Sequence, residues 1–146
     1  MTIKVGLNGY GTIGKRVADA IAMQKDMKLV GVTAHSYSFN TEVAKQKGYK
    51  IFSVNGPSDL VSNGINPDGD LNNLLEEADV IVDATPRKIA KENIDNYYKP
   101  KKIKAIVQGG EKHEVTGTSF VAQCNYNEAL NKDYVRVVSC NTTGLC

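Results

Sequence analysis

The chain has 146 residues, 41% of them hydrophobic and 23% charged, which fits one ordinary globular domain and excludes a disordered chain. Its 18 basic and 16 acidic side chains are interleaved to a net charge of +2, so no basic block favours nucleic acid or an anionic membrane. No apolar stretch approaches the ~20 residues that cross a bilayer. Three cysteines and two histidines show no metal-ligand spacing. We expect a cytoplasmic protein without a metal site or a disulfide framework.

Apolar runs rich in β-branched residues alternate with helix-like patterns, which predicts parallel strands joined by crossover helices. The predicted strands cover residues 3–7, 29–33, 49–54, 80–84, 104–108, 119–125 and 134–139. Glycines and prolines predict that residues 55–70 are mostly turn. Gly109 and Gly110 are expected to end the strand at 104–108, and a helix is expected after Ser139.

Helical patterns follow the strands. The first predicted helix buries a stripe formed by Ile13, Val17 and Ala20/Ile21. Further helices are predicted at residues 41–47 and near 71–77, with a helical turn at 126–130. Another helix is predicted to open at Thr85-Pro86, with Thr85 as the N-cap and proline in the first helical position.

A glycine-rich turn lies between the first strand and the first helix. Residues 8–14 read NGYGTIG and contain the pattern G-x-G-x-x-G at Gly9, Gly11 and Gly14. Gly9 permits a tight turn, Gly11 lets the backbone approach a pyrophosphate, and Gly14 allows the helix to pack closely on the strand. Backbone amides around Thr12 and Ile13 are expected to meet the phosphate oxygens. A purely structural turn could use the same glycines, but the strand and helix context favours a dinucleotide site. We therefore predict an α/β Rossmann fold: a doubly wound, mostly parallel sheet in one domain, residues 1–146.

The residues after the second strand bear on the choice of cofactor. An NAD-selective fold carries an acidic residue there, about twenty positions after the glycines, whereas this chain has His35 and Ser36. Without a carboxylate nothing repels a 2′-phosphate, and both side chains could donate hydrogen bonds to one. The sequence therefore predicts that NADP is accepted at least as well as NAD. The alternative is that His35 and Ser36 are solvated loop residues.

Cys140 lies where a predicted strand ends and a helix begins. Because parallel strands bind ligands outside their carboxyl ends, Cys140 is expected on the same edge as the glycine-rich turn. A helix N-terminus favours the thiolate, the form that attacks a carbonyl, and its amides could stabilise an oxyanion. The alternative is that Cys140 is a small buried hydrophobe. Cys124, in the predicted strand at 119–125, is expected to be core or half-buried.

The motifs together closely resemble the archaeal branch of the phosphorylating glyceraldehyde-3-phosphate dehydrogenases. They are NGYGTIGKRVADAI at 8–21, QGGEK at 108–112 and SCNTTGL at 139–145. The resemblance runs along the whole chain and corresponds to the N-terminal half of such an enzyme. It implies the following site: Cys140 as the nucleophile; Ser139 and Asn141 as substrate contacts; Thr12, Ile13, Thr85 and Gly110 as cofactor contacts.

The implied activity is NAD(P)-dependent oxidative phosphorylation of glyceraldehyde 3-phosphate to 1,3-bisphosphoglycerate through a cysteine thioester, in a homotetramer. The resemblance also implies that the catalytic histidine and the phosphate-binding groups come from a second domain. We therefore expect this chain alone to bind cofactor with little turnover. His113 is a conceivable substitute base, against the alternative of a solvent-facing loop histidine. Two other functions stay open: a stand-alone NAD(P)-binding sensor that contacts a partner protein, and a relative of the semialdehyde dehydrogenases.

Overall fold

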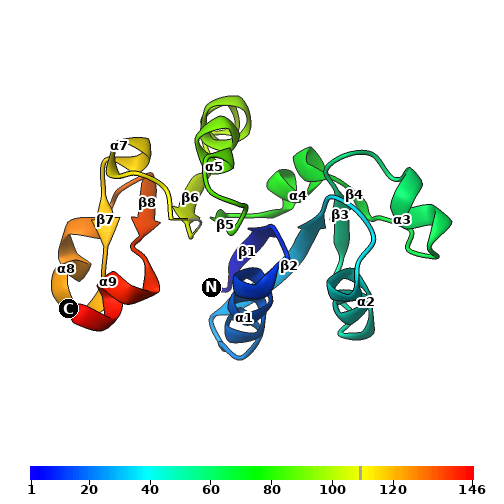
Figure 1. Ribbon diagram of the computed structural model, residues 1–146, viewed down its shortest axis with the longest axis horizontal. Coiled ribbons are helices and arrows are strands. Elements are labelled where there is room, and N and C mark those ends of the chain that lie inside the picture. The colour runs from blue at the N-terminus through cyan, green and yellow to red at the C-terminus, as the bar shows by residue number, and fades with distance from the viewer. Residues whose placement is uncertain (109) are drawn as a thin grey trace.

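The computed structural model describes residues 1–108 and 110–146, and their strands form one parallel sheet (Figure 1). The described strands are β1 (Ile3–Asn8), β2 (Met27–Ala34), β3 (Ile51–Ser53), β4 (Gly69–Asp70), β5 (Val80–Asp83), β6 (Lys104–Val107), β7 (Ser119–Phe120) and β8 (Tyr134–Val137). They are ordered β4-β3-β2-β1-β5-β6-β8-β7. The strand order therefore reverses between β1 and β5, the switch point at which open α/β sheets bind ligands. This order confirms the predicted Rossmann fold.

Helices cover both faces of the sheet. The described helices are α1 (Thr12–Ala22), α2 (Phe39–Gln46), α3 (Ser58–Ser62), α4 (Leu71–Glu77), α5 (Ile89–Asn93), the π-helix η1 (Ile94–Tyr98), α6 (Lys99–Lys101), α7 (His113–Thr116), α8 (Ala122–Ala129) and α9 (Cys140–Leu145). Figure 1 shows α1 and α2 on one side of the sheet and α4 and α5 on the other. Each side has its own apolar cluster, one around Leu7 and Val32 and the other around Phe52 and Ile81. No helix in the described part of the chain is long and apolar enough to cross a membrane.

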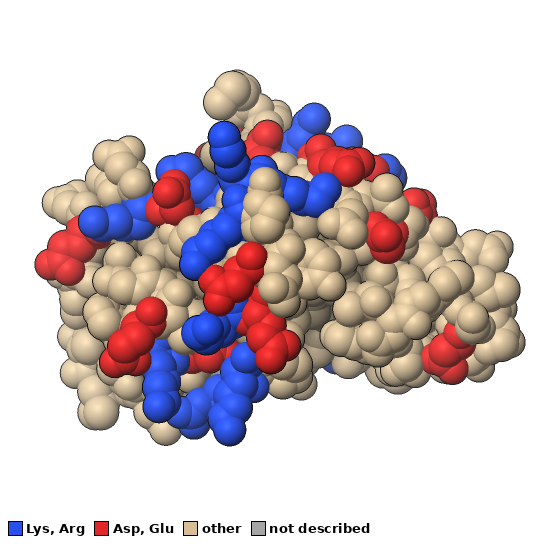
Figure 2. Space-filling model, turned by 90° about the horizontal axis from the view of Figure 1, so that it is seen from above, with Lys and Arg blue, Asp and Glu red and all other residues tan. Residues whose placement is uncertain are grey.

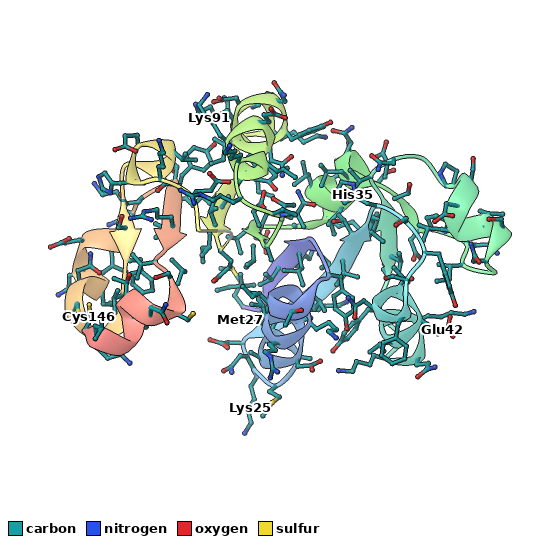
Figure 3. The ribbon with its side chains drawn as sticks, viewed as in Figure 1. Lys25, Met27, His35, Glu42, Lys91 and Cys146 are labelled. Atoms are coloured by element: carbon teal, nitrogen blue, oxygen red, sulfur yellow. The ribbon has the colours of Figure 1, made fainter. Side chains whose placement is uncertain are left out.

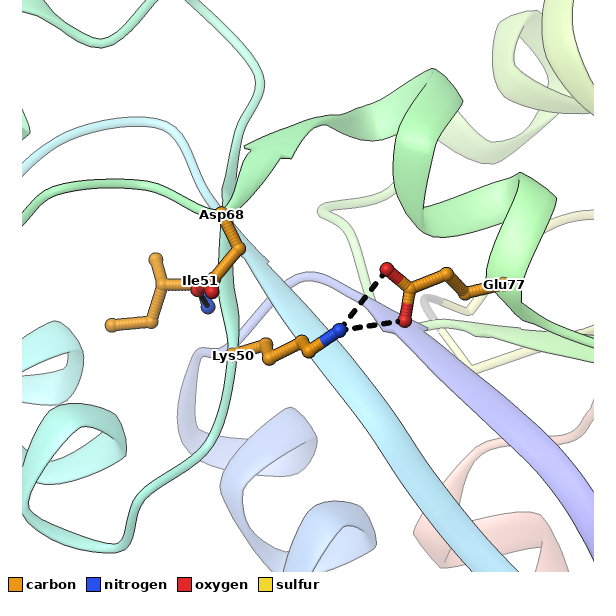
Figure 4. Close-up of polar contacts among 4 residues, drawn as sticks. All are labelled: Lys50, Ile51, Asp68 and Glu77. Atoms are coloured by element: carbon orange, nitrogen blue, oxygen red, sulfur yellow. Dashed lines mark hydrogen bonds and ion pairs between the residues drawn. The ribbon is translucent and has the colours of Figure 1, made fainter.

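Polar contacts hold the start of β3, the second strand from one edge of the sheet (Figure 4). Ile51 N donates to the Asp68 carboxylate at 3.0 Å, and Asp68 N donates back to the Ile51 carbonyl at 2.8 Å. Lys50 Nζ forms an ion pair with Glu77 at 2.9 Å, which links β3 to the end of α4. The two contacts with Asp68 satisfy the amide and the carbonyl of Ile51, before the pairing of β3 with β4 begins at Phe52.

Charges of both signs alternate on the face that carries α5 (Figure 2). Asp95 pairs there with Lys91 at 3.3 Å and with Lys99 at 2.6 Å, and Lys101 pairs with Glu76 at 3.2 Å. These lysines are thus neutralised locally by carboxylates, as the interleaved sequence predicts.

The buried face of α1 differs from the predicted stripe. Its buried residues are Gly14, Ala18 and Ile21. Ile13 is 52% exposed and Ala20 is also exposed, so the prediction was wrong for both. The cause is the contact at Gly14, where a Cβ atom would lie 2.1 Å from the Gly9 carbonyl oxygen. That contact presses the Gly14 side of the helix onto β1 and leaves Ile13 free to face the carboxyl edge.

Thr85 does not cap a helix, so this prediction was also wrong. Helix α5 begins at Ile89, after Lys88 with φ +79°. The Thr85 hydroxyl instead donates to Asp83 Oδ1 at 2.5 Å, and Thr85 N donates to the same oxygen at 3.0 Å. The buried Asp83 carboxylate thus holds both the hydroxyl and the amide of Thr85 at the end of β5, and residues 84–86 stay non-helical.

The predicted strand at residues 119–125 is mostly wrong. β7 ends at Phe120 and α8 begins at Ala122. Asn125 carries the kink inside α8, with φ −143°, and its side chain accepts from Val121 N at 2.9 Å and donates to the Ser119 carbonyl at 2.8 Å. This side-chain bridge competes with extended backbone pairing. Cys124 is consequently exposed, not core or half-buried as expected.

Candidate functional site

A cleft of about 850 Å³ opens at the carboxyl edge of the sheet, within the range of about 300–1,000 Å³ typical of small-molecule sites. It lies between the turn after β1, the loops after β5 and β6, and the segment after β8. The lining includes seven of the predicted site residues: Gly11, Thr12, Ile13, Thr85, Gly110, Ser139 and Cys140. Residues 11 and 140, far apart in the sequence, thus face one space. The expected role of Gly109 lies outside the described residues.

The three glycines of the turn meet different surroundings. Gly9 has φ +101°, and a Cβ atom there would lie 2.9 Å from the backbone of Ala84. A Cβ on Gly14 would collide with Gly9. A Cβ on Gly11 would meet no described atom within 4 Å, and the Gly11 backbone, with φ −83°, faces the cleft. The turn therefore leaves open space where a pyrophosphate would lie, so these residues fit a dinucleotide.

The start of α1 is suited to an anion. Its N-cap is Gly11, which contributes no side-chain hydrogen bond, and its first turn holds no acidic residue. Thr12 and Ile13 are exposed and line the cleft. Unpaired first-turn amides and the helix dipole attract phosphate oxygens. This end of the cleft can therefore bind a pyrophosphate.

Cys140, the first residue of α9, also lines the cleft. It is a free, exposed cysteine, so the alternative of a small buried hydrophobe is wrong. Ser139 caps α9, because its Oγ accepts from Thr142 N at 3.2 Å. Asn141, the next residue, is exposed and lies outside the lining of the cleft in the described part of the chain. A thiol and a helix cap thus face the space that the glycine-rich turn borders.

His35, labelled in Figure 3, and its neighbour Ser36 follow β2. Both residues lie outside the described lining of this cleft. Both are exposed, and His35 Nδ1 lies 3.2 Å from Asn55 Nδ2. Because β2 is adjacent to β1 in the sheet, they lie on the same carboxyl edge. The structure therefore leaves them accessible at that edge, beside the cleft and not within it.

His113 is not brought to Cys140. Its Nδ1 lies 2.8 Å from Ser119 Oγ, which also accepts from Arg136 Nε at 2.7 Å. His113 is absent from the described lining of the cleft, so the geometry gives no support to its use as the base for the Cys140 thiol. It is exposed to solvent, as the alternative interpretation has it, but it is the first residue of α7 and not a loop residue.

Sequence reasoning missed a buried polar group beneath the cleft. Asp83, the last residue of β5, is fully buried and accepts hydrogen bonds from Thr85, Asn93 and Tyr98. The one available signal was an acidic residue at the carboxyl end of an otherwise apolar strand, VIVD at 80–83. A buried carboxylate needs several donors, and those donors cannot be identified from local sequence.

Comparison with known protein families gives a match along nearly the whole chain. A family model described as dihydrodipicolinate reductase, N-terminus, matches residues 3–141. The match covers every element that borders the cleft up to the start of α9.

Individual relatives carry a different description from the family model. The chain is 50% identical over 150 residues to a glyceraldehyde-3-phosphate dehydrogenase of Methanocaldococcus jannaschii, covering 100% of this chain and 44% of the relative. It is 53% identical over 146 residues to a protein of the same description from Methanothermobacter thermautotrophicus, covering 99% and 43%. The chain therefore spans less than half the length of these relatives.

Solved structures share the fold at low sequence identity. An NAD-binding protein from Listeria innocua aligns with a TM-score of 0.57 at 18% identity, over 94% of this chain and 35% of that one. A myo-inositol dehydrogenase from Corynebacterium glutamicum aligns with a TM-score of 0.54, also at 18% identity, over 94% and 36%. At this identity the likeness shows the fold alone.

Proposed function

We propose that this chain supplies the cofactor site and the nucleophile of an archaeal-type glyceraldehyde-3-phosphate dehydrogenase, as its nucleotide-binding N-terminal domain. The chain belongs to the family of dihydrodipicolinate reductase N-terminal domains. Its cofactor is NAD(P). The observation that carries the proposal is the single cleft lined by both the glycine-rich turn and Cys140. Residues 1–146 then act as one cofactor-binding domain.

Different residues of the cleft bind the cofactor, attack the aldehyde and contact the substrate. Gly11 and the first turn of α1 hold the pyrophosphate, with Thr85 and Gly110 along the cofactor. The Cys140 thiolate adds to the aldehyde carbon and retains the acyl group as a thioester, which inorganic phosphate then cleaves to give an acyl phosphate. NAD(P)⁺, when bound, accepts the hydride released by this oxidation. Ser139 and Asn141 contact the substrate beside the sulfur.

Other properties of the whole enzyme belong to the same proposal. The substrate is glyceraldehyde 3-phosphate and the assembly is a homotetramer. The location is the cytoplasm, and three free cysteines agree with such a reducing compartment. The 146-residue chain alone binds cofactor with little turnover, since no described histidine reaches Cys140 in the cleft. A steady-state assay of the chain with aldehyde and phosphate checks this, and ordinary dehydrogenase rates would refute it.

The choice of cofactor rests on the end of β2. We propose that NADP binds at least as well as NAD, because the exposed residues there are His35 and Ser36 and not a carboxylate. Calorimetric titration with each cofactor measures the two dissociation constants. A clear preference for NAD would overturn this part of the proposal.

The cysteines provide an internal control for the site. Cys124, Cys140 and Cys146 are all exposed, but in the described structure only Cys140 lines the cleft. We expect iodoacetamide to modify Cys140 fastest at neutral pH, and saturating NAD(P)⁺ to change the rate at Cys140 but not at Cys124. Peptide mass spectrometry resolves the individual rates. If Cys140 is alkylated slowly and NAD(P)⁺ does not change its alkylation rate, the proposal is contradicted. A cofactor sensor without catalytic activity is then favoured.

A further inference from the structure

A run of hydrogen bonds, partly buried at its start and buried beyond it, leads from the glycine-rich turn to the end of β5, next to the cleft. Gly9 N donates to Thr33 Oγ1 at 2.8 Å. The Thr33 hydroxyl donates to Asn8 Oδ1 at 2.7 Å, and Asn8 Nδ2 donates to the Tyr98 hydroxyl at 2.8 Å. Residues at the ends of β1 and β2 are thereby joined to the last residue of η1.

The run ends on a carboxylate. The Tyr98 hydroxyl donates to Asp83 Oδ2 at 2.6 Å, and Asn93 Nδ2 donates to the same oxygen at 2.9 Å. The other oxygen, Asp83 Oδ1, accepts from the amide and the hydroxyl of Thr85. The hydrogen bonds therefore connect the Gly9 amide of the glycine-rich turn with the Thr85 amide of the loop after β5.

Every donor in the run points toward Asp83. An ionised carboxylate can only accept, so it sets the direction of the Tyr98 hydroxyl, which in turn sets that of the Asn8 amide. Asp83 and Tyr98 are 0% exposed, Thr33 is 1% exposed and Asn8 is 2% exposed. Aligned hydrogen bonds in such a dry environment strengthen one another, and losing one leaves costly unpaired groups.

Tyr98 reaches this position from a π-helix. η1 covers Ile94–Tyr98, between α5 and α6, and π-helices occur frequently at functional sites. Burial and the charge of Asp83 raise the pKa of the Tyr98 phenol, which keeps its proton available for donation. Neither Tyr98 nor Asp83 lines the cleft in the described structure.

The two segments that the run connects, the glycine-rich turn and the loop after β5, also touch directly. Gly9 lies so close to Ala84 that a Cβ atom would come within 2.9 Å of the Ala84 carbonyl. Ala84 N donates to the Asn8 carbonyl at 2.8 Å. A shift of the loop after β5 must therefore move the glycine-rich turn, and the reverse also holds.

We propose that Tyr98 and Asp83 are positioning residues for the cofactor: through this run of hydrogen bonds they hold the glycine-rich turn and the backbone at Thr85 at the separation that NAD(P) binding requires. The inference rests on the proposed function, because it takes the cleft as the cofactor site. It assigns a role to residues that do not touch the cofactor.

The first test is Tyr98→Phe, which removes the hydroxyl and leaves Asn8 Nδ2 and Asp83 Oδ2 each without one partner. We expect the calorimetric Kd for NAD(P)⁺ to rise about tenfold at a temperature where the variant is fully folded. The matched control is Ile103→Val, which truncates a buried residue of the same cluster at the amino end of β6. We expect this control to lower stability but to leave Kd unchanged. A Tyr98→Phe variant that loses stability but keeps the wild-type Kd would overturn the positioning role.

A second variant tests whether the hydrogen bonds act as one unit. Thr33→Val is expected to raise Kd to a similar extent, and the double variant with Tyr98→Phe to show about the same tenfold loss. A hundredfold loss in the double variant would mean independent effects and would contradict a single unit. Without cofactor, hydrogen exchange at the Gly9 and Thr85 amides should accelerate in Tyr98→Phe, and unchanged exchange would contradict the inference.

The wild-type titration separates the two proposals. If the wild-type chain binds neither NAD⁺ nor NADP⁺, the proposed function fails and the positioning role fails with it. If the wild-type chain binds and both variants bind equally well, the positioning role alone fails.

Discussion

Gly11 and Gly14 lie three positions apart in one turn, yet a methyl group would affect them differently. Gly14→Ala places a Cβ atom 2.1 Å from the Gly9 carbonyl oxygen, so α1 must move away from β1. Gly11→Ala meets no described protein atom within 4 Å, and its φ of −83° suits alanine. We expect Gly14→Ala to lower the free energy of unfolding by ~2 kcal/mol or more through overpacking and backbone shift.

Gly11→Ala is expected to keep wild-type stability and to weaken NAD(P) binding at least tenfold, because its methyl group would occupy the space that we propose for the pyrophosphate. Urea unfolding and calorimetric titration measure the two quantities on the same samples. If Gly11→Ala binds NAD(P) with unchanged affinity, the pyrophosphate does not bind next to Gly11.

Tyr10 and Tyr98 are both buried, but their hydroxyl groups differ. The Tyr10 side chain is 6% exposed, and its hydroxyl has no hydrogen-bond partner among the described residues. An unpaired buried hydroxyl costs ~1–3 kcal/mol. We therefore expect Tyr10→Phe to raise the free energy of unfolding by ~1 kcal/mol. A loss of stability, measured by urea unfolding, would show that the hydroxyl has a favourable partner.

At the scale of the element, helix starts show where local sequence suffices. α4 covers Leu71–Glu77, the range that the sequence predicts, and its N-cap Asp70 forms a reciprocal capping box with Asn73. Thr85 also has good capping chemistry, but it binds Asp83 instead. Local signals therefore predict the helix start at Asp70, where both capping partners are local. They fail at Thr85, because Asp83 lies only two positions away but is buried by its bonds to Asn93 and Tyr98.

α2 begins with a capping box whose two halves are unequal. Thr41 Oγ1 accepts from Ser38 N at 2.9 Å and donates to the Ser38 carbonyl at 2.7 Å, whereas Thr41 N lies 3.4 Å from Ser38 Oγ. We expect Thr41→Val to cost ~1–2 kcal/mol of stability and Ser38→Ala less than ~1 kcal/mol. The midpoints of urea unfolding rank the two. Equal losses would contradict the inequality seen in the distances.

An ion pair between α1 and the end of α2 makes stability depend on pH. Lys47 Nζ lies 2.5 Å from Asp19 Oδ1, and this hydrogen bond lowers the pKa of the Asp19 carboxyl below its ordinary value. A group with a lowered folded-state pKa stabilises above its unfolded-state pKa, about 3.9, and loses that contribution as pH falls through the folded-state value. Asp19→Asn should therefore be less stable than wild type at pH 7, with the difference vanishing at strongly acid pH. If the difference in stability persists at strongly acid pH, it arises from packing and not from the ion pair.

At the scale of the whole molecule, cofactor binding and folding are linked. A ligand that binds only the folded state at 100 times its Kd stabilises that state by ~2.7 kcal/mol. We expect saturating NAD(P)⁺ to raise the unfolding temperature of the wild-type chain, and the same concentration to have a much smaller effect on Gly11→Ala. Thermal unfolding with and without cofactor measures this, with adenine as a negative control. If the cofactor stabilises the wild-type chain and Gly11→Ala equally, it does not bind at the glycine-rich turn.

The sequence by itself determined the Rossmann fold, the glycine-rich turn and the position of Cys140 at a strand end. These features depend on short-range patterns: the hydrophobic periods of strands and helices, the backbone freedom of three glycines, and the rule that parallel strands bring their carboxyl ends to one edge.

Only the tertiary structure decided which face of α1 is buried, why Thr85 does not start a helix, and how Asn8, Asp83 and Tyr98 join beneath the cleft. The hydrogen bond from Asn8 to Tyr98 spans 90 positions of the sequence. Such a partner is set by which strands become neighbours and which helix covers them. A pattern of a few residues carries no information on that choice.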